Sequence, residues 1–252
     1  MSGSSYKIDA HWGPRQESAR ACGPRLALML ERLSAIHPAF AQWNKQAETR
    51  ETANEPFCAM PPNVDELIQI FEKNRRYRDA TGEAWPEIGY WVGAWNGIDD
   101  ANGISITVKA GDYSDKPMFP NWVEIDPHPQ QPGNERLLSA ETLKPVLLSV
   151  AAAWEPAWGS VSTWEYWTKR FPSPQRVPVF RSGWMTYLSS PYARKITPPA
   201  SAITEPVAGG GILMLATNEP FDVGNPQHVA VADAIQACLE PLQANPLLGT
   251  AP

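Results

Sequence analysis

The chain has 252 residues, and its 27 acidic and 21 basic side chains give a formal net charge of −6. Such a chain does not offer the basic surface that nonspecific binding to nucleic acid or anionic lipid requires. It contains 26 prolines but also 11 tryptophans, so we expect a sizeable core built from many short elements rather than disorder. No apolar run reaches the roughly 18 residues of a membrane span, and residues 1–9 do not resemble a signal peptide.

Cysteine and histidine usage gives no sign of a metal or disulfide framework. Cys22, Cys58 and Cys238 are far apart and form no CxxC pair, which predicts reduced thiols in a cytoplasmic protein. The four histidines, His11, His37, His128 and His228, have no second ligand at metal-binding spacing. We therefore expect neither a bound metal nor a cofactor.

Motifs for catalysis are equally scarce. The sequence has no GxSxG elbow, HExxH pair, Walker loop or GxGxxG fingerprint. Gly209-Gly210-Gly211 precedes an apolar run instead of opening a helix, so it predicts a turn into a buried strand rather than a phosphate loop.

The first third of the chain predicts a strand, a helix, a second strand and a long polar loop. In order, these elements are expected at 5–13, 19–36, 40–47 and 48–62. Gly23-Pro24 should kink the helix or shift its start. A second helix begins after Asn63, the expected N-cap, with Glu66 three residues on. The cations at its end, within 73–78, suit the negative end of the helix dipole.

Three strands then follow in close succession, at 88–94, 104–109 and 122–126. Apolar and polar residues alternate along them, as in half-buried antiparallel strands. Short connections make a meander the economical topology. The predicted inward set is Ile88, Tyr90, Val92, Ile104, Ile106, Val108, Val123 and Ile125.

The second half predicts further helices and strands. A helix at 142–154 would have Thr142 as its cap and Pro145 in its first turn. Strands are expected at 158–168, 184–188 and 211–217, and a last helix opens at Asn225-Pro226 with Val231, Ile235, Cys238 and Leu239 inward. The order predicts an α+β fold with helices packed mainly on one face of the sheet. We expect one domain over 1–252, whose halves meet near 127–138.

Acidic residues gather at one end of the predicted meander. Asp99 and Asp100 lie in its first turn, and the third strand returns Asp126 and His128 to the same end. Such a rim could bind a divalent cation or act as acid and base. The alternative is that these residues cap turns and face water.

Large aromatic side chains lie on the other face of the same strands. Trp91, Trp95 and Trp122 would point away from the helices, among small polar residues. This pattern is typical of a protein-recognition surface. The alternative is that the second half of the chain covers this face.

The stretch Arg75 to Gly97, RRYRDATGEAWPEIGYWVGAWNG, resembles the immunity protein 52 family. The similarity rests on Arg78-Asp79, Gly82, Pro86 to Tyr90, and Trp95 to Gly97. The order of flanking segments also fits the family, with Phe40-Ala41-Gln42-Trp43 before it and a helix leading into Trp154 and Trp158 after it.

The resemblance implies a bacterial immunity protein of a polymorphic-toxin or type VI secretion system, with no reaction of its own. It would bind a cognate toxin, commonly a nuclease of the restriction-endonuclease-like fold, in the cytoplasm. Under this hypothesis the candidate toxin-binding residues are Asp99, Asp100, Asp126, Trp91, Trp95 and Trp122. Two alternatives stay open: a metal-dependent hydrolase using Asp99, Asp100, Asp126 and His128, and a non-catalytic adaptor subunit.

Overall fold

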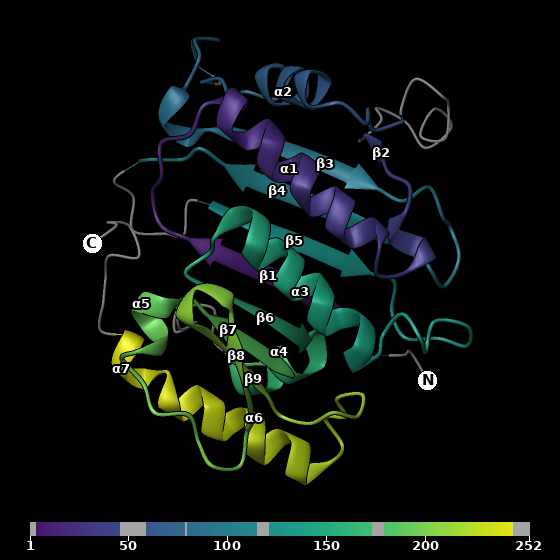
Figure 1. Cartoon of the computed structure of the whole chain (residues 1–252), viewed down its shortest axis with the longest axis vertical. Coiled ribbons are helices and arrows are strands. Elements are labelled where there is room, and N and C mark those ends of the chain that lie inside the picture. Colours follow the sequence, from purple (N-terminus) through teal and green to yellow (C-terminus); the bar gives the residue numbers. More distant parts are fainter. Residues whose placement is uncertain (1–3, 46–58, 79, 115–120, 173–178, 244–252) are drawn as a thin grey trace.

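The computed structural model describes residues 4–45, 59–78, 80–114, 121–172 and 179–243. Nine strands form one antiparallel sheet in the order β2-β3-β4-β5-β1-β6-β7-β9-β8 (Figure 1). The strands are β1 Tyr6–Trp12, β2 Asn44–Lys45, β3 Tyr90–Trp95, β4 Ile104–Ala110, β5 Asn121–Pro127, β6 Trp158–Thr163, β7 Met185–Leu188, β8 Ile203–Val207 and β9 Gly211–Leu215. The helices are α1 Ala19–Ser34, α2 Val64–Lys73, α3 Ala140–Trp154, α4 Trp164–Arg170, α5 Ser190–Ala193, α6 Pro226–Cys238 and α7 Glu240–Gln243. Three 3-10 turns are Pro38–Phe40, Pro86–Ile88 and Ala208–Gly210.

Strands β3, β4 and β5 form the predicted meander, and the α+β class is confirmed. Buried and more exposed residues alternate along β4 and β5, because every second side chain points into the core. Ile88 departs from the prediction: it lies in the 3-10 turn before β3 and is only half-buried.

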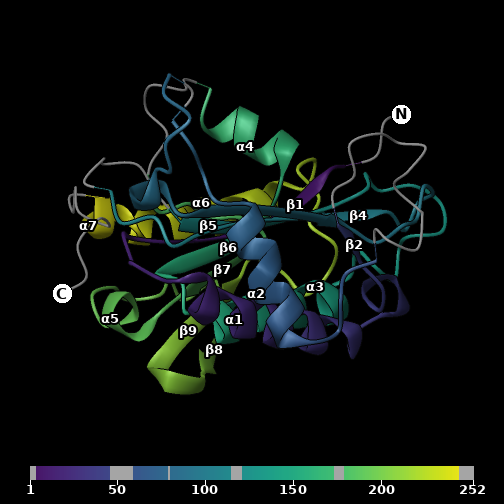
Figure 2. The same cartoon turned by 90° about the horizontal axis from the view of Figure 1, so that it is seen from above.

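Helices α1, α2 and α3 cover one face of the sheet, whereas α4 projects from the other (Figure 2). Phe71 of α2 meets the ring of Tyr90 edge-on, with centroids 5.8 Å apart, and Trp154 of α3 stacks on Trp12 at 5.5 Å. A second cluster of buried apolar residues fills the opposite face under α6 and α7. Its members include Trp158, Leu188, Met214, Ile235 and Leu239. This second cluster lies over β6, β7 and β9, so the β3–β4–β5 part of that face is left without it.

Two prolines lie farther inside their helices than the sequence suggested. Helix α1 begins at Ala19, so Pro24 does not shift its start, and a Cβ on Gly23 would lie 2.6 Å from Cγ1 of Ile68. Gly23 therefore allows α1 and α2 to approach closely. Helix α3 begins at Ala140 after Ser139, which places Pro145 beyond the first turn. A proline in a helix interior costs about 3 kcal/mol, and the fully buried apolar face of α3 offsets that cost.

Two predicted strands are much shorter than expected. The strand expected at 158–168 ends at Thr163, whose hydroxyl accepts a hydrogen bond from the Tyr166 backbone N–H and begins α4. Of the strand expected at 40–47, only Asn44–Lys45 pairs with β3, and residues 46–47 lie outside the described part. The edge strand β8 was not predicted, because Pro206 and its exposed neighbours hide the alternation.

Helix α2 has the predicted cap, since Oδ1 of Asn63 accepts from the Glu66 backbone N–H at 2.8 Å. The dipole interpretation of the cations is only partly correct, because α2 ends at Lys73. Residues 74–89, apart from residue 79, form an extension that we call the arm, in which Tyr77 pairs with Ala84.

Strand β1 lies between β5 and β6 and so joins strands from both halves of the chain. The division near 127–138 stays a prediction. Cys22 and Cys238 carry free thiols, and Cys58 lies outside the described residues. Within the described ranges, no helix has the length and apolar character needed to cross a membrane.

Candidate functional site

The part of the sheet opposite α1, α2 and α3 that α6 leaves open is here called the uncovered face. The antiparallel register aligns its side chains in three rows across β3, β4, β5 and β1. The rows are Trp91-Lys109-Trp122-His11, Gly93-Thr107-Glu124-Asp9 and Trp95-Ser105-Asp126, and Lys7 lies beside Asp126 at the end of the third row. Directly opposed side chains in such a sheet are in contact range, so each row acts as one surface strip.

The predicted tryptophans lie on this face. Trp91 is 42% exposed and meets Trp122 edge-on at 5.5 Å, whereas Trp95 and Trp122 are half-buried. The guanidinium of Arg76, from the arm, lies 5.7 Å from the ring centroid of Trp91. The second half of the chain therefore covers only the adjoining part of this face and leaves the Trp91–Trp122 pair accessible.

Exposed aromatic residues also flank the uncovered face on two sides. Tyr77 of the arm is 53% exposed, and Trp164 at the start of α4 is 61% exposed. Together with Trp91, these are the exposed large aromatic side chains of the described residues. Large apolar groups that gather at the surface of a protein often belong to interaction sites, so these three residues are candidates for one.

The charges on the uncovered face are paired with one another. Nζ of Lys7 lies 2.9 Å from Glu124 and 3.7 Å from Asp126, and Lys109 pairs with Asp112 at 2.9 Å. Partial burial, followed by the negative charge of Glu124, raises the pKa of Asp126 to about 6, although Lys7 opposes the shift. The face is thus close to electrically balanced rather than strongly acidic.

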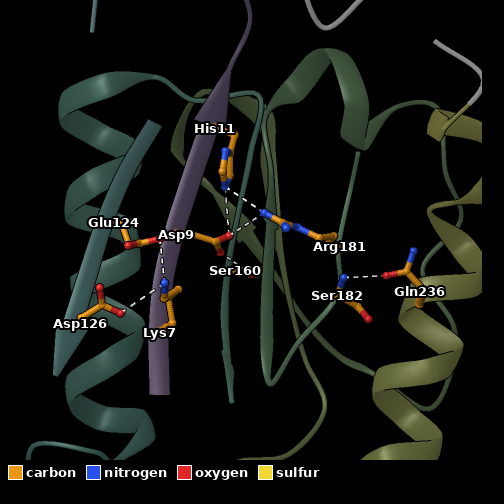
Figure 3. Close-up of polar contacts among 9 residues, drawn as sticks. All are labelled: Lys7, Asp9, His11, Glu124, Asp126, Ser160, Arg181, Ser182 and Gln236. Atoms are coloured by element: carbon orange, nitrogen blue, oxygen red, sulfur yellow. Dashed lines mark hydrogen bonds and ion pairs between the residues drawn. The ribbon is translucent and has the colours of Figure 1, made fainter. Parts of the chain in front are cut away.

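Asp9 is the centre of a buried polar network at the edge of this face (Figure 3). Its Oδ1 accepts from Ser160 at 2.5 Å, and its Oδ2 contacts Nε2 of His11 at 3.0 Å and Nη2 of Arg181 at 3.1 Å. Burial would raise the pKa of Asp9, but His11, Arg181 and Ser160 outweigh burial and lower it to about 2. Burial lowers the pKa of His11, although Asp9 opposes that shift.

This network does not have the geometry of a hydrolytic triad. The Ser160 hydroxyl donates to the Asp9 carboxylate, whereas a nucleophilic serine donates to an imidazole that removes its proton. Within the described ranges, no group of three or more His, Cys, Asp or Glu side chains is arranged to hold a metal ion.

The structure divides the residues of the predicted acidic rim into two groups: His128 contacts Asp100 at the turn, and Asp126 pairs with Lys7. Nδ1 of His128 lies 2.5 Å from the backbone oxygen of Asp100, and Oδ1 of Asp100 accepts from the Asn102 backbone N–H. Asp99 is exposed in the same turn, whereas Asp126 pairs with Lys7 on the uncovered face. Asp100 thus stabilises a turn at the surface, and the toxin-binding role of Asp99 and Asp100 stays a prediction.

Several residues of the uncovered face were not predicted from the sequence. Lys7, Asp9 and His11 alternate with buried Tyr6, Ile8, Ala10 and Trp12, so the period-two pattern was a usable signal. Arg181 is 172 positions from Asp9 in the sequence. No local pattern indicates such a contact.

Comparison with known proteins identifies a family and a solved structure of similar fold. The family model described as immunity protein 52 matches residues 4–248. The type VI secretion system (T6SS) protein PA0821 of Pseudomonas aeruginosa has a similar fold, with a TM-score of 0.52 and 13% identity over 94% of this chain and 74% of that one. A search of curated proteins gives no significant match.

Proposed function

Because the chain belongs to the immunity protein 52 family, we propose that it neutralises a cognate toxin by stoichiometric binding, without a reaction of its own. The observation that carries this proposal is the exposure of the large aromatic side chains of Tyr77, Trp91 and Trp164 on and beside the uncovered face. Aromatic residues of this kind dominate the energy of protein interfaces and control how slowly a complex dissociates. Trp95 and Trp122, which lie on the same face, would add to the contact area.

The proposed partner is a nuclease effector of the restriction-endonuclease-like fold, met in the cytoplasm. The resemblance of the fold to a T6SS protein supports the secretion-system setting. A nuclease presents cations that bind phosphate, and the exposed Asp99 and Asp100 would attract them at long range. Asp126 is a weaker candidate for that attraction, since Lys7 balances its charge. No cofactor and no direct contact with nucleic acid is needed.

Two modes of inhibition fit this proposal: occlusion of the toxin's active site, or obstruction of an assembly that the toxin requires. In both, inhibition follows the fraction of toxin bound. A stable interface of ordinary size covers about 800 Å² on each partner. The uncovered face with the arm and α4 offers a continuous surface for such a contact.

Co-expression with the toxin encoded beside this gene tests the proposal. We expect growth to be restored and the two proteins to co-elute in a fixed ratio. A double variant, Trp91→Ala with Trp164→Ala, should lose both effects while remaining folded. Rescue of growth without a detectable complex would contradict the proposal and favour an enzymatic or adaptor role.

A further inference from the structure

A cavity of about 220 Å³ opens between β1, the end of β6 and α4, beside the uncovered face. Asp9, Glu124 and Ser162 line its sheet side, and Trp164, Trp167 and Arg181 line the side nearer to α4. The guanidinium of Arg181 lies 3.7 Å from the ring centroid of Trp167, which fixes its plane against the cavity wall. The cavity has room for one side chain.

The acidic groups at this cavity already have cationic partners. Both oxygens of Asp9 accept hydrogen bonds, from Ser160 on one side and from His11 and Arg181 on the other. Glu124 is paired with Lys7 (Figure 3). The negative charge at this cavity is therefore already largely balanced.

Hydrogen-bond donors, in contrast, are left over. Ser162 is only 4% exposed, and within the part of the chain that the structure describes its hydroxyl has no hydrogen-bond partner. The same is true of the buried Nε–H of Arg181. A buried polar group without a partner is destabilising, and such groups commonly mark a binding site. Ser160 lies on the same face of β6, but its hydroxyl, unlike that of Ser162, donates a hydrogen bond to Asp9.

We propose that this cavity is a receptor for one acidic side chain of the bound protein, with Arg181 and Ser162 donating to its carboxylate. A guanidinium presents its N–H groups in a fixed plane that matches a carboxylate. The cavity adjoins the uncovered face, so a protein docked there could insert a side chain without a second contact surface. This inference rests on the proposed function, and it identifies a cavity that would help the protein to recognise its own toxin.

Ser162→Ala and Ser160→Ala form a matched pair of variants. Ser162→Ala removes a hydroxyl that has no partner, so we expect thermal stability equal to or above that of the wild type. Ser160→Ala removes a donor to Asp9, so it should lower thermal stability. Equal destabilisation by both would mean that the Ser162 hydroxyl is satisfied in the unbound protein, which would overturn the proposal.

Binding is tested with blocked amino acids and the indole N–H signals of Trp164 and Trp167 in nitrogen-15 NMR spectra. N-acetyl-aspartate methylamide should shift these signals, and the asparagine analogue should bind at least about tenfold more weakly, because hydrogen bonds to a charged group are stronger. Ser162→Ala and Arg181→Lys should each weaken binding of the aspartate probe by a similar factor. Equal binding of the asparagine probe, tighter binding of the arginine analogue, or no shift with any probe would overturn the proposal.

Binding measurements with the co-expressed toxin distinguish an error in the cavity proposal from an error in the proposed function. Absence of a complex with the wild-type chain would defeat the proposed function. A complex of unchanged affinity with Ser162→Ala and Arg181→Lys would defeat only the pocket.

Discussion

Replacing Asp9 with asparagine should destabilise the protein more than any other single change of charge on the uncovered face. The side chains of Asp9 and Arg181 are only 8% and 14% exposed, so the substitution leaves a cation buried without its counter-ion. Removing one partner of a buried ion pair typically costs about 3–5 kcal/mol. Small domains are stable by only about 5–15 kcal/mol, so the loss should be evident in a urea unfolding curve.

The pH dependence of that loss follows from the pKa of Asp9, which is lowered from 3.8 to about 2 in the folded protein. A depressed pKa contributes stability above the unfolded value, and that contribution disappears as the pH falls through the folded value. The shift corresponds to about 2 kcal/mol. The difference in free energy of unfolding between wild type and Asp9→Asn should therefore narrow by about this amount between pH 5 and pH 2.

Asp126→Asn is the matched control on the same face. Its carboxylate is 39% exposed, and its pKa is raised to about 6, so its charged form is disfavoured in the folded state. At pH 7 the substitution should leave stability unchanged or slightly higher, and the wild type should itself gain stability as the pH falls through 6 toward 4. An Asp9→Asn variant as stable as Asp126→Asn at pH 7 would refute the assigned role of the buried network.

Three further variants test separate parts of the account. Trp164→Ala should speed dissociation of the toxin at a cost of about 2 kcal/mol or more in surface plasmon resonance, with little change in melting temperature; an unchanged dissociation rate would remove α4 from the interface. Replacing Asp99 and Asp100 together by asparagine should slow association at low salt and have little effect at high salt, since screening acts over about 8 Å at physiological ionic strength; a salt-independent loss would argue against steering. Asn96→Ala should cost about 3 kcal/mol in urea unfolding, because its buried amide donates to Ala39 and Asn102 at 2.9 and 2.8 Å; a cost below about 1 kcal/mol would contradict that.

The local parts of the fold were predictable because they depend on neighbouring residues. The alternation in β4 and β5 and the Asn63 cap of α2 come from spacings of two and three residues. Pro145 was misplaced because burial of the α3 face, a tertiary effect, outweighs the local penalty of a proline inside the helix.

The site was predictable only in part, for the same physical reason. The direction of Trp91 and Trp122 follows from strand alternation, and the structure agrees with it. The pairing of Asp126 with Lys7 and of Asp9 with Arg181 depends on β1 lying beside β5 and on a distant loop. No spacing in the sequence indicates such contacts, so the partners of Asp126 and Asp9 could not be predicted.

The affinity of the purified toxin for two double variants tests the central claim most directly. Trp91→Glu with Trp164→Glu changes the uncovered face and its flank, whereas Leu28→Glu with Val64→Glu changes exposed apolar residues, 37% and 38% exposed, on α1 and α2. Isothermal titration calorimetry should show at least about thirtyfold weaker binding for the first pair and unchanged binding for the second. Unchanged binding by the tryptophan pair, with loss in the Leu28 and Val64 pair, would place the toxin on the helical side and contradict the account.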